Sequence, residues 1–341
     1  MSSEKKNTEK KKACVSVGGQ AVMEGVMMQG PDRVALAVRR SDGKVVLKVK
    51  PLKQPKDKYP ILGWPIIRGV VSFCYQLYNG MKTLTESAEI AGEEMEEPSK
   101  FEKKFAEVFH MKADDVMMVF AVILALLLSI VLFFVIPTAI ETLLRRFISS
   151  RVLLNIIGGI LRIVMFLGYV GLVSKMKEIK RVFMYHGAEH KSIFCFESGK
   201  ELTVENAREF TTLHPRCGTS FLVIVMVISI FVFTLLGTNS TNVFARVGSR
   251  LLLLPLVAGV SYEILKWLGR AEDTPIVKAL KWPGLMVQKI TTAQPDDSML
   301  EVALISLKAA LGMPDALPKE LDPDYVAPQE DADTNETEAV E

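Results

Sequence analysis

Two histidines and a glutamate lie close together in the stretch YHGAEHK, which runs from Tyr185 to Lys191. The order His186-x-x-Glu189-His190 is the H-x-x-E-H pattern, in which both histidines bind zinc and the glutamate takes a proton from metal-bound water. Apolar residues at helical spacing run through MKEIKRVFMYHGAEHKSIF and place both imidazoles on the apolar face of one helix. Two neighbouring buried imidazoles both need partners, and a divalent metal satisfies one nitrogen of each.

A third ligand is required, and the downstream motif TLHPRCGTS offers His214 and Cys217. His214 is expected to end a helix over VENAREFTTL, because Pro215 disfavours helical backbone at the residue before it. Cys217 then lies in the turn that enters an apolar segment. This set of residues predicts a site for one divalent metal and favours zinc. Two alternatives stay open: His214 as a helix cap that interacts with the helix dipole, and Cys217 as a small buried residue.

The rest of the chain indicates a membrane protein, because 49% of its residues are hydrophobic and the apolar ones gather in long runs. The run from Val116 to Ile140 contains no charged residue and is long enough to cross a bilayer. Three further spans are predicted at Val152 to Val173, Thr219 to Leu236 and Leu251 to Leu268. The second and fourth contain charges, so they also fit buried helices of a soluble core.

Arg162 and Glu263 are the charges that matter inside those two spans. Arg162 lies 11 residues from Arg151, and Glu263 lies 13 residues from Arg250. At about 1.5 Å per residue the two reach similar depths in parallel-running helices. We therefore predict an intramembrane ion pair between them, and Glu263 reaches the histidines only if the second span breaks.

The predicted fold is mainly α: a polytopic membrane protein with four transmembrane helices and a small β-rich N-terminal cytosolic segment. Asp42-Gly43 joins two β-rich runs as a hairpin, GGQAVMEGVMMQGP supplies tight backbone before them, and Trp64 to Ala91 turns helical. The expected divisions are a disordered tail (1–13), the cytosolic hairpin and helix region (14–115), the membrane domain (116–268) with its histidine-rich loop (174–218), a C-terminal segment (269–317) and an acidic disordered tail (318–341).

The distribution of charges and cysteines indicates the orientation in the membrane, the redox compartment and the kinds of partner to expect. Lysines after the second span, with Arg181, favour a cytoplasmic histidine loop and cytoplasmic termini under the positive-inside rule. The 41 basic and 39 acidic residues form no basic stripe, so nucleic acid is not an expected partner. Four cysteines without a C-x-x-C pair fit a reducing compartment, and the charged N-terminus is not a cleaved signal peptide. The expected partner is the lipid bilayer, with a membrane-associated substrate; the oligomeric state stays open.

Several ordered motifs resemble one known family. GGQAVMEGVMMQGP, IIRGV, YHGAEHK, LHPRCGTSF, SYEILK and PGLMVQKITTAQPDDSMLEVA together are similar to the YqhQ-like proteins, the domain-of-unknown-function family numbered 1385. The resemblance covers nearly everything between residues 14 and 312. It implies a metal-dependent membrane enzyme without a named reaction, and it adds Glu24, Arg68 and Gln288 to the residues of interest.

Two classes of function follow. The first is a membrane-embedded metal-dependent hydrolase in which His186, His190 and His214 hold the metal, Cys217 is a further ligand and Glu189 is the general base. The second is a non-enzymatic adaptor or small transporter with a structural metal or polar site. An open coordination position separates the two classes.

Overall fold

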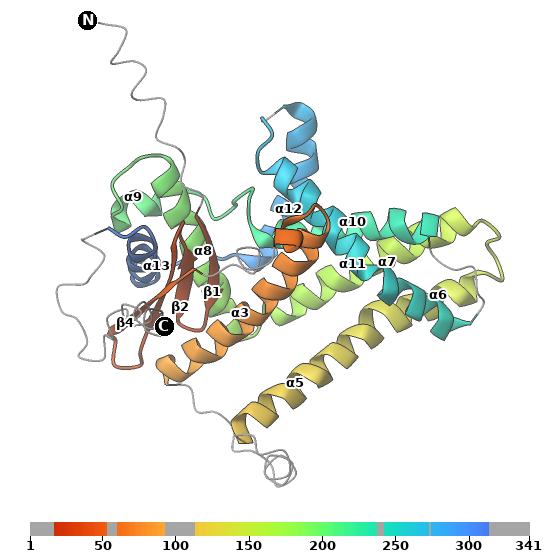
Figure 1. Cartoon of the computed structure of the whole chain (residues 1–341), viewed down its shortest axis with the longest axis horizontal. Helices are drawn as coiled ribbons and strands as arrows, with labels where there is room; N and C mark the ends of the chain where they lie inside the picture. The colour runs from red at the N-terminus through yellow and green to blue at the C-terminus, as the bar shows by residue number, and fades with distance from the viewer. Residues whose placement is uncertain (1–16, 53–59, 93–112, 237–241, 273, 314–341) are drawn as a thin grey trace, which may run out of the picture.

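A computed structural model describes residues 17–52, 60–92, 113–236, 242–272 and 274–313 of the chain. The two predicted tails and most of the charged segment before the first span lie outside these residues. The fold is mainly helical, and a small antiparallel sheet stands at one end (Figure 1).

The sheet is a four-stranded meander in the order β1-β2-β3-β4. Its strands are β1 (Gly18–Val22), β2 (Gly25–Gln29), β3 (Arg33–Arg39) and β4 (Val45–Pro51). The predicted hairpin is confirmed, because β3 and β4 pair through a turn in which Gly43 has a φ of 87°. The sequence before it forms two strands rather than the tight backbone expected. Gly25 is needed there because a Cβ would lie 2.3 Å from the Ala37 carbonyl of β3.

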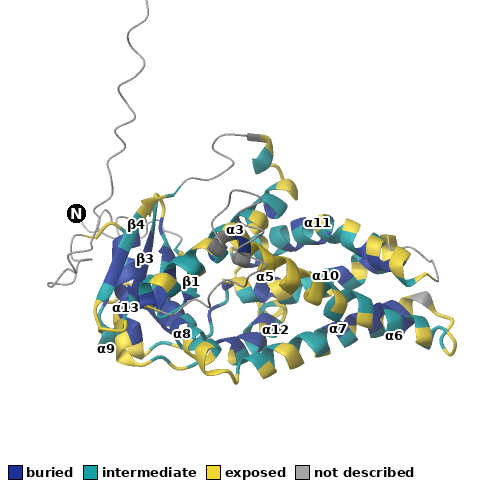
Figure 2. Cartoon of the chain, turned by 90° about the horizontal axis from the view of Figure 1, so that it is seen from below, coloured by how far each residue is buried: buried dark blue, intermediate teal, exposed yellow. Residues whose placement is uncertain are grey.

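Both faces of the sheet are covered. On one face Val26, Met28 and Ala35 pack against two helices, α8 (Lys177–Glu197) and α13 (Asp297–Ala310). On the other face Val22 and Val38 pack against the end of α3 (Ile67–Ala91). Figure 2 shows most of the buried residues gathered in this part of the molecule. The histidine helix α8 is thus fixed against a packed core.

Four helices are long and apolar enough to cross a membrane. They comprise α5 (Ala113–Ile130) continued by a π-helical turn (Val131–Val135) and α6 (Ile136–Leu144), then α7 (Arg151–Val173), α10 (Gly218–Leu236) and α11 (Val243–Leu268). Large apolar side chains cover their outer surface, among them Leu252, which is 82% exposed. Such a surface suits lipid and not water. The helices extend away from the sheet, and α6 lies at the far end (Figure 1).

The remaining elements join the two parts. A 3₁₀ turn (Pro60–Gly63) precedes α3, which begins beside α11 and ends against the sheet. Gly69 and Gly259 permit this contact, since a Cβ on Gly69 would lie 2.7 Å from the Tyr262 Cβ. Helix α12 (Pro275–Thr291) packs along α10 and delivers the chain back to α8.

The helix predicted over VENAREFTTL is much shorter than expected. Only α9 (Val204–Arg208) forms, and the chain then runs without regular structure to His214. Side chains of α8 hold the carbonyls that a longer helix would use: Lys191 Nζ donates to the carbonyls of Arg208 and Phe210, at 2.8 and 2.5 Å. The expectation that this helix extends to His214 was therefore wrong, and so is the alternative that His214 caps it.

Candidate metal centre

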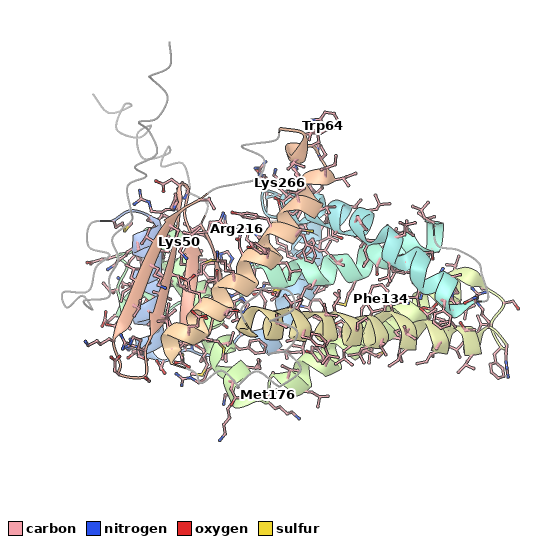
Figure 3. All side chains as sticks on the ribbon, turned by 60° about the horizontal axis from the view of Figure 1, so that its bottom comes forward. Lys50, Trp64, Phe134, Met176, Arg216 and Lys266 are labelled. Atoms are coloured by element: carbon pink, nitrogen blue, oxygen red, sulfur yellow. The ribbon has the colours of Figure 1, made fainter. Side chains whose placement is uncertain are left out.

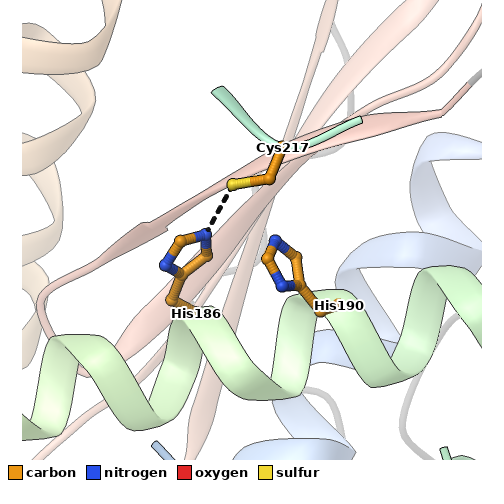
Figure 4. A group of neighbouring side chains, drawn as sticks. All are labelled: His186, His190 and Cys217. Carbon is orange, nitrogen blue, oxygen red and sulfur yellow. Dashed lines mark hydrogen bonds between the residues drawn. The ribbon is translucent and has the colours of Figure 1, made fainter. Parts of the chain in front are cut away.

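Three side chains that could bind a metal converge between α8 and the start of α10. His186 and His190 leave α8 one turn apart and point toward Cys217, which immediately precedes α10 (Figure 4). One nitrogen of each imidazole and the Cys217 Sγ lie within 4.8 Å of one another. The His186 Nε2 to Cys217 Sγ distance is 3.2 Å. The predicted helix, and the convergence of these three residues, are both present.

The backbone sets the tautomer of both imidazoles. His186 Nδ1 lies 2.9 Å from the Thr291 carbonyl, and His190 Nδ1 lies 2.5 Å from the Thr212 carbonyl. A carbonyl can only accept, so each Nδ1 carries the proton and donates it. Each Nε2 then keeps a lone pair, and both face Cys217. His190 Nε2 is buried and has no hydrogen-bond partner among the described residues.

The carbonyl of Thr291 is held in place at the end of α12. There the chain runs beside α8, and Ala293 N donates to the Phe183 carbonyl at 2.8 Å. Gly187 allows this approach, because a Cβ on it would lie 2.1 Å from the Ala293 carbonyl oxygen. The glycine between the two histidines therefore brings the Thr291 carbonyl to His186.

Gln288 fixes the loop that carries Cys217. Its Oε1 accepts from the His214 amide at 2.7 Å, and its Nε2 donates to the His214 carbonyl at 2.8 Å and to Ser220 Oγ at 3.3 Å. The side chain is fully buried. Sequence alone attached no chemistry to this residue. Its role is to tie α12 to the loop and so to position Cys217.

His214 lies beside the three-residue group and not in it. Its ring centroid is 5.5 Å from that of His190, its Nδ1 accepts from the Arg216 amide at 3.3 Å, and its Nε2 lies 3.5 Å from a Glu197 carboxylate oxygen. Burial lowers the pKa of His214 to about 4, so the ring is neutral at pH 7. Phe194 packs edge-on against it. The expected ligand role of His214 stays a prediction.

Glu189 lies on α8 between the two histidines and packs against strand β1 of the sheet. It is buried, and a Cβ on Gly19 of β1 would lie 2.8 Å from its Cδ. The structure gives this carboxyl no hydrogen-bond partner among the described residues. Burial raises its pKa, and the nearby His186 and His214 partly oppose this effect. His190 shows the converse, because burial lowers the pKa of an imidazole.

The predicted pair between Arg162 and Glu263 is wrong. Arg162 Nη2 lies 3.0 Å from Glu141 Oε1, whereas Glu263 accepts from Arg68 Nε at 2.7 Å. Arg68 belongs to α3, which packs along α11 and brings a closer guanidinium to Glu263. Two of the motif residues are thereby accounted for as an ion pair that joins these helices.

Glu24 also has a partner. It occupies the turn between β1 and β2 with a φ of 49°, and its carboxylate pairs with both Arg181 Nε and Nη2. Tyr185 Oη lies 3.4 Å from the same carboxylate. Because Arg181 and Tyr185 lie on α8 just before His186, Glu24 anchors the start of the histidine-bearing turn to the sheet.

The donor set fits zinc better than a hard cation. Two neutral imidazoles and a thiolate are the ligands that zinc prefers in tetrahedral sites, whereas magnesium and calcium prefer oxygen. Each imidazole already donates its Nδ1–H to a backbone carbonyl, which is the usual arrangement around a bound metal. The fit rests on this arrangement and on the unpartnered His190 Nε2.

Comparison with known proteins identifies the family. The family described as Protein of unknown function (DUF1385) matches residues 64–313. This chain is a member of that family. Uncharacterized protein YqhQ of Bacillus subtilis (strain 168) is 34% identical over 306 residues, which cover 89% of this chain and 94% of that protein. No solved structure matches. The DUF1385 match includes His186, Glu189, His190 and Cys217 but begins after the sheet.

Proposed function

We propose that this chain is a metal-dependent membrane enzyme, hydrolytic in action, with its site at the end of the membrane helices nearest the sheet. The observation that carries the proposal is the paired tautomer of His186 and His190. Both Nδ1 atoms donate to backbone carbonyls, so two Nε2 lone pairs face Cys217 in a buried place. Without a cation, His190 Nε2 is a buried acceptor that lacks a partner.

The residues divide into ligands, supports and a base. His186, His190 and Cys217 would hold the metal, which when bound supplies a Lewis acid and lowers the pKa of water. The Thr291 and Thr212 carbonyls keep the rings oriented, and Gln288 keeps the cysteine loop in place. Glu189 would take a proton during hydrolysis. Its carboxyl is buried against Gly19 and interacts electrostatically with the ring of His186.

The position at the membrane surface supports a membrane-associated substrate. Cys217 directly precedes the candidate span Gly218–Leu236, and α8 begins four residues after the span that ends at Val173. Lys175, Lys177 and Lys180 flank this end, so we assign it to the cytoplasm together with both termini. Single cysteines placed near Ser198 and near Thr238 test the assignment with an impermeant label on intact cells. Labelling near Ser198 but not near Thr238 would reverse it.

Metal analysis of the purified protein tests the site. We expect about one zinc-like ion per chain. We expect His186→Ala and His190→Ala to lose it, whereas Cys74→Ala removes an exposed thiol that does not belong to this group and should keep the metal. Cys217→Ala should also lose it, and His214→Ala decides whether that ring is a ligand. Equal metal in wild type and in both histidine variants would rule out this site.

A structural metal site in a non-enzymatic membrane protein is the second candidate. It is favoured by burial, since His190 is 1% and Cys217 8% exposed, and closed sites are typical of structural zinc. Glu189→Gln separates the candidates because it removes the base and keeps the shape. The enzyme proposal expects wild-type metal content and failure to complement a deletion strain, with a loss of about 10²- to 10⁴-fold in rate. Full complementation by Glu189→Gln, with failure of His186→Ala, would favour the structural site.

A further inference from the structure

A second cluster of charges lies at the other end of the helices, around a single carboxylate. Glu141 of α6 accepts from Arg162 Nη2 of α7 at 3.0 Å and from Arg250 Nη2 of α11 at 2.6 Å, and it also pairs with Arg246 Nη2. Glu141 is 0% exposed and none of the three arginines exceeds 8%. Helix α6 lies at the end of the molecule farthest from the sheet and α8 (Figure 1).

The positive charges in this cluster outnumber the negative ones. Three guanidiniums face one carboxylate, which leaves two uncompensated positive charges in a buried place. No other residue nearby in sequence can supply the balance. Glu141 is the only acidic residue between Val116 and Val173, and the chain from Phe210 to Tyr262 has none. Buried charges without a counter-charge are costly inside an apolar helix bundle.

The cluster also leaves donors unused. Arg162 Nε donates to the Phe133 carbonyl at 3.2 Å. Phe133 belongs to the π-helical turn, whose next residue, Phe134, is labelled in Figure 3. Arg246 Nη1 donates to Thr142 Oγ1 at 2.8 Å, and Arg250 Nη1 donates to Thr138 Oγ1. These contacts and the bonds to Glu141 use two nitrogens of each guanidinium, which leaves Arg162 Nη1, Arg246 Nε and Arg250 Nε for a further acceptor.

The shape of the cluster adds a further observation. Gly158 of α7 faces Glu141, and a Cβ there would lie 1.7 Å from Glu141 Oε1. The carboxylate is therefore seated against the backbone of α7, on one side of the arginines. All basic residues of the four spans up to Tyr262 are arginines, with no lysine among them. Arginine presents a planar fork that matches phosphate and carboxylate oxygens, whereas lysine acts as a point charge.

We propose that Arg162, Arg246 and Arg250 form a binding site for a phosphate-type oxyanion, either the phosphate group of an anionic lipid or inorganic phosphate. A phosphate brings about two negative charges and several acceptor oxygens, which match the two excess positive charges and the unused donors. Glu141 holds the three guanidiniums together and leaves their remaining N–H groups for the ligand. The proposal is independent of the metal centre.

The full chain, purified in dodecyl maltoside and stripped of phospholipid, is the material for the test. One arm titrates inorganic phosphate against sodium chloride of equal ionic strength. The other adds dioleoylphosphatidylglycerol against dioleoylglycerol, which has the same acyl chains and no phosphate. The midpoint of thermal unfolding is measured in each. A saturable rise with phosphate indicates a soluble oxyanion, and a rise with phosphatidylglycerol alone indicates a lipid phosphate. No rise in either arm beyond its control would overturn the proposal.

Variants tie the effect to the cluster. Arg162→Gln should raise the ligand concentration needed for half-saturation about 10- to 100-fold, because one charged hydrogen-bonding group is lost. Arg250→Lys keeps the charge without the fork and should also weaken it. Arg146→Gln is the matched control, since Arg146 is exposed at the same end of the helices. An equal effect of Arg146→Gln and Arg162→Gln would mean general charge screening and would refute the site. If a cluster variant does not fold, the wild-type arms still decide.

Discussion

Gln288→Leu tests whether one buried side chain holds the cysteine loop. Leucine has a similar volume but no polar atoms, so the variant leaves the amide and the carbonyl of His214 without partners in a buried place. Each unsatisfied group costs about 1–3 kcal/mol. Together they favour opening of the loop by roughly 2–6 kcal/mol, less any gain from the added apolar contact.

Hydrogen–deuterium exchange of the peptide over residues 209–217 measures that opening. Because 1.4 kcal/mol is a factor of ten, 2 kcal/mol accelerates exchange of the His214 amide about 30-fold. The peptide over α13 should exchange as in wild type, which separates local opening from global unfolding. Gln294→Leu is the control, because Gln294 is exposed in the same segment. Unchanged exchange in Gln288→Leu would refute the positioning role.

Two other predictions concern the supports of α8 and of the sheet. Gly187→Ala should destabilise the protein by about 1–3 kcal/mol or more, because the added Cβ would meet the Ala293 carbonyl. Gly168→Ala is the control, since a Cβ there has open space around it, and this variant should be neutral or slightly stabilising. Thermal melts compare the two variants, and equal unfolding midpoints would contradict the steric argument. Burial alone would raise the pKa of Glu86, but hydrogen bonds from Lys50 and Lys48 outweigh it and hold that pKa below its usual value. The ionised Glu86 carboxylate therefore stabilises the folded protein fully above the pKa of about 4.3 that a glutamate has in the unfolded chain. This contribution is lost as the pH falls through the lower pKa that Glu86 has in the folded protein. The difference in melting midpoint between wild type and Glu86→Gln should shrink over that acid range, and a difference independent of pH would contradict the prediction.

The sequence predicted the parts of the site that depend on local periodicity. The helix through the two histidines, the apolar spans and the approach of Cys217 all follow from spacing along the chain. The carbonyls of Thr212 and Thr291 could not be predicted, since any residue type offers a carbonyl and only the folded chain brings these two to α8. The contact of Gln288 with His214 joins residues 74 positions apart.

The early end of the helix before His214 has a related cause. Local propensity favours continuing it, and Pro215 is the signal in the sequence that stops it. Lys191 overrides that propensity by drawing two carbonyls out of the helix. Lys191 belongs to the YHGAEHK motif itself. A lysine directly after a histidine in this helix is the one feature of the sequence that could indicate the contact. A buried ammonium needs acceptors, and free carbonyls at an unwound segment provide them.

Arg162 pairs with Glu141 and not with Glu263, although Arg162 and Glu263 were predicted to lie at similar depths in the membrane. Counting residues fixes the height of a side chain along a helix, but it does not fix the direction around the helix axis in which the side chain points. The first span was also predicted to stop at Ile140, one residue before the carboxylate that Arg162 contacts. In the structure the helix continues to Leu144, and Glu141 can be buried because Arg162, Arg246 and Arg250 surround it. Glu263 then pairs with Arg68 from α3, outside the four spans, so the two acidic residues within the four candidate spans serve different ends of the molecule.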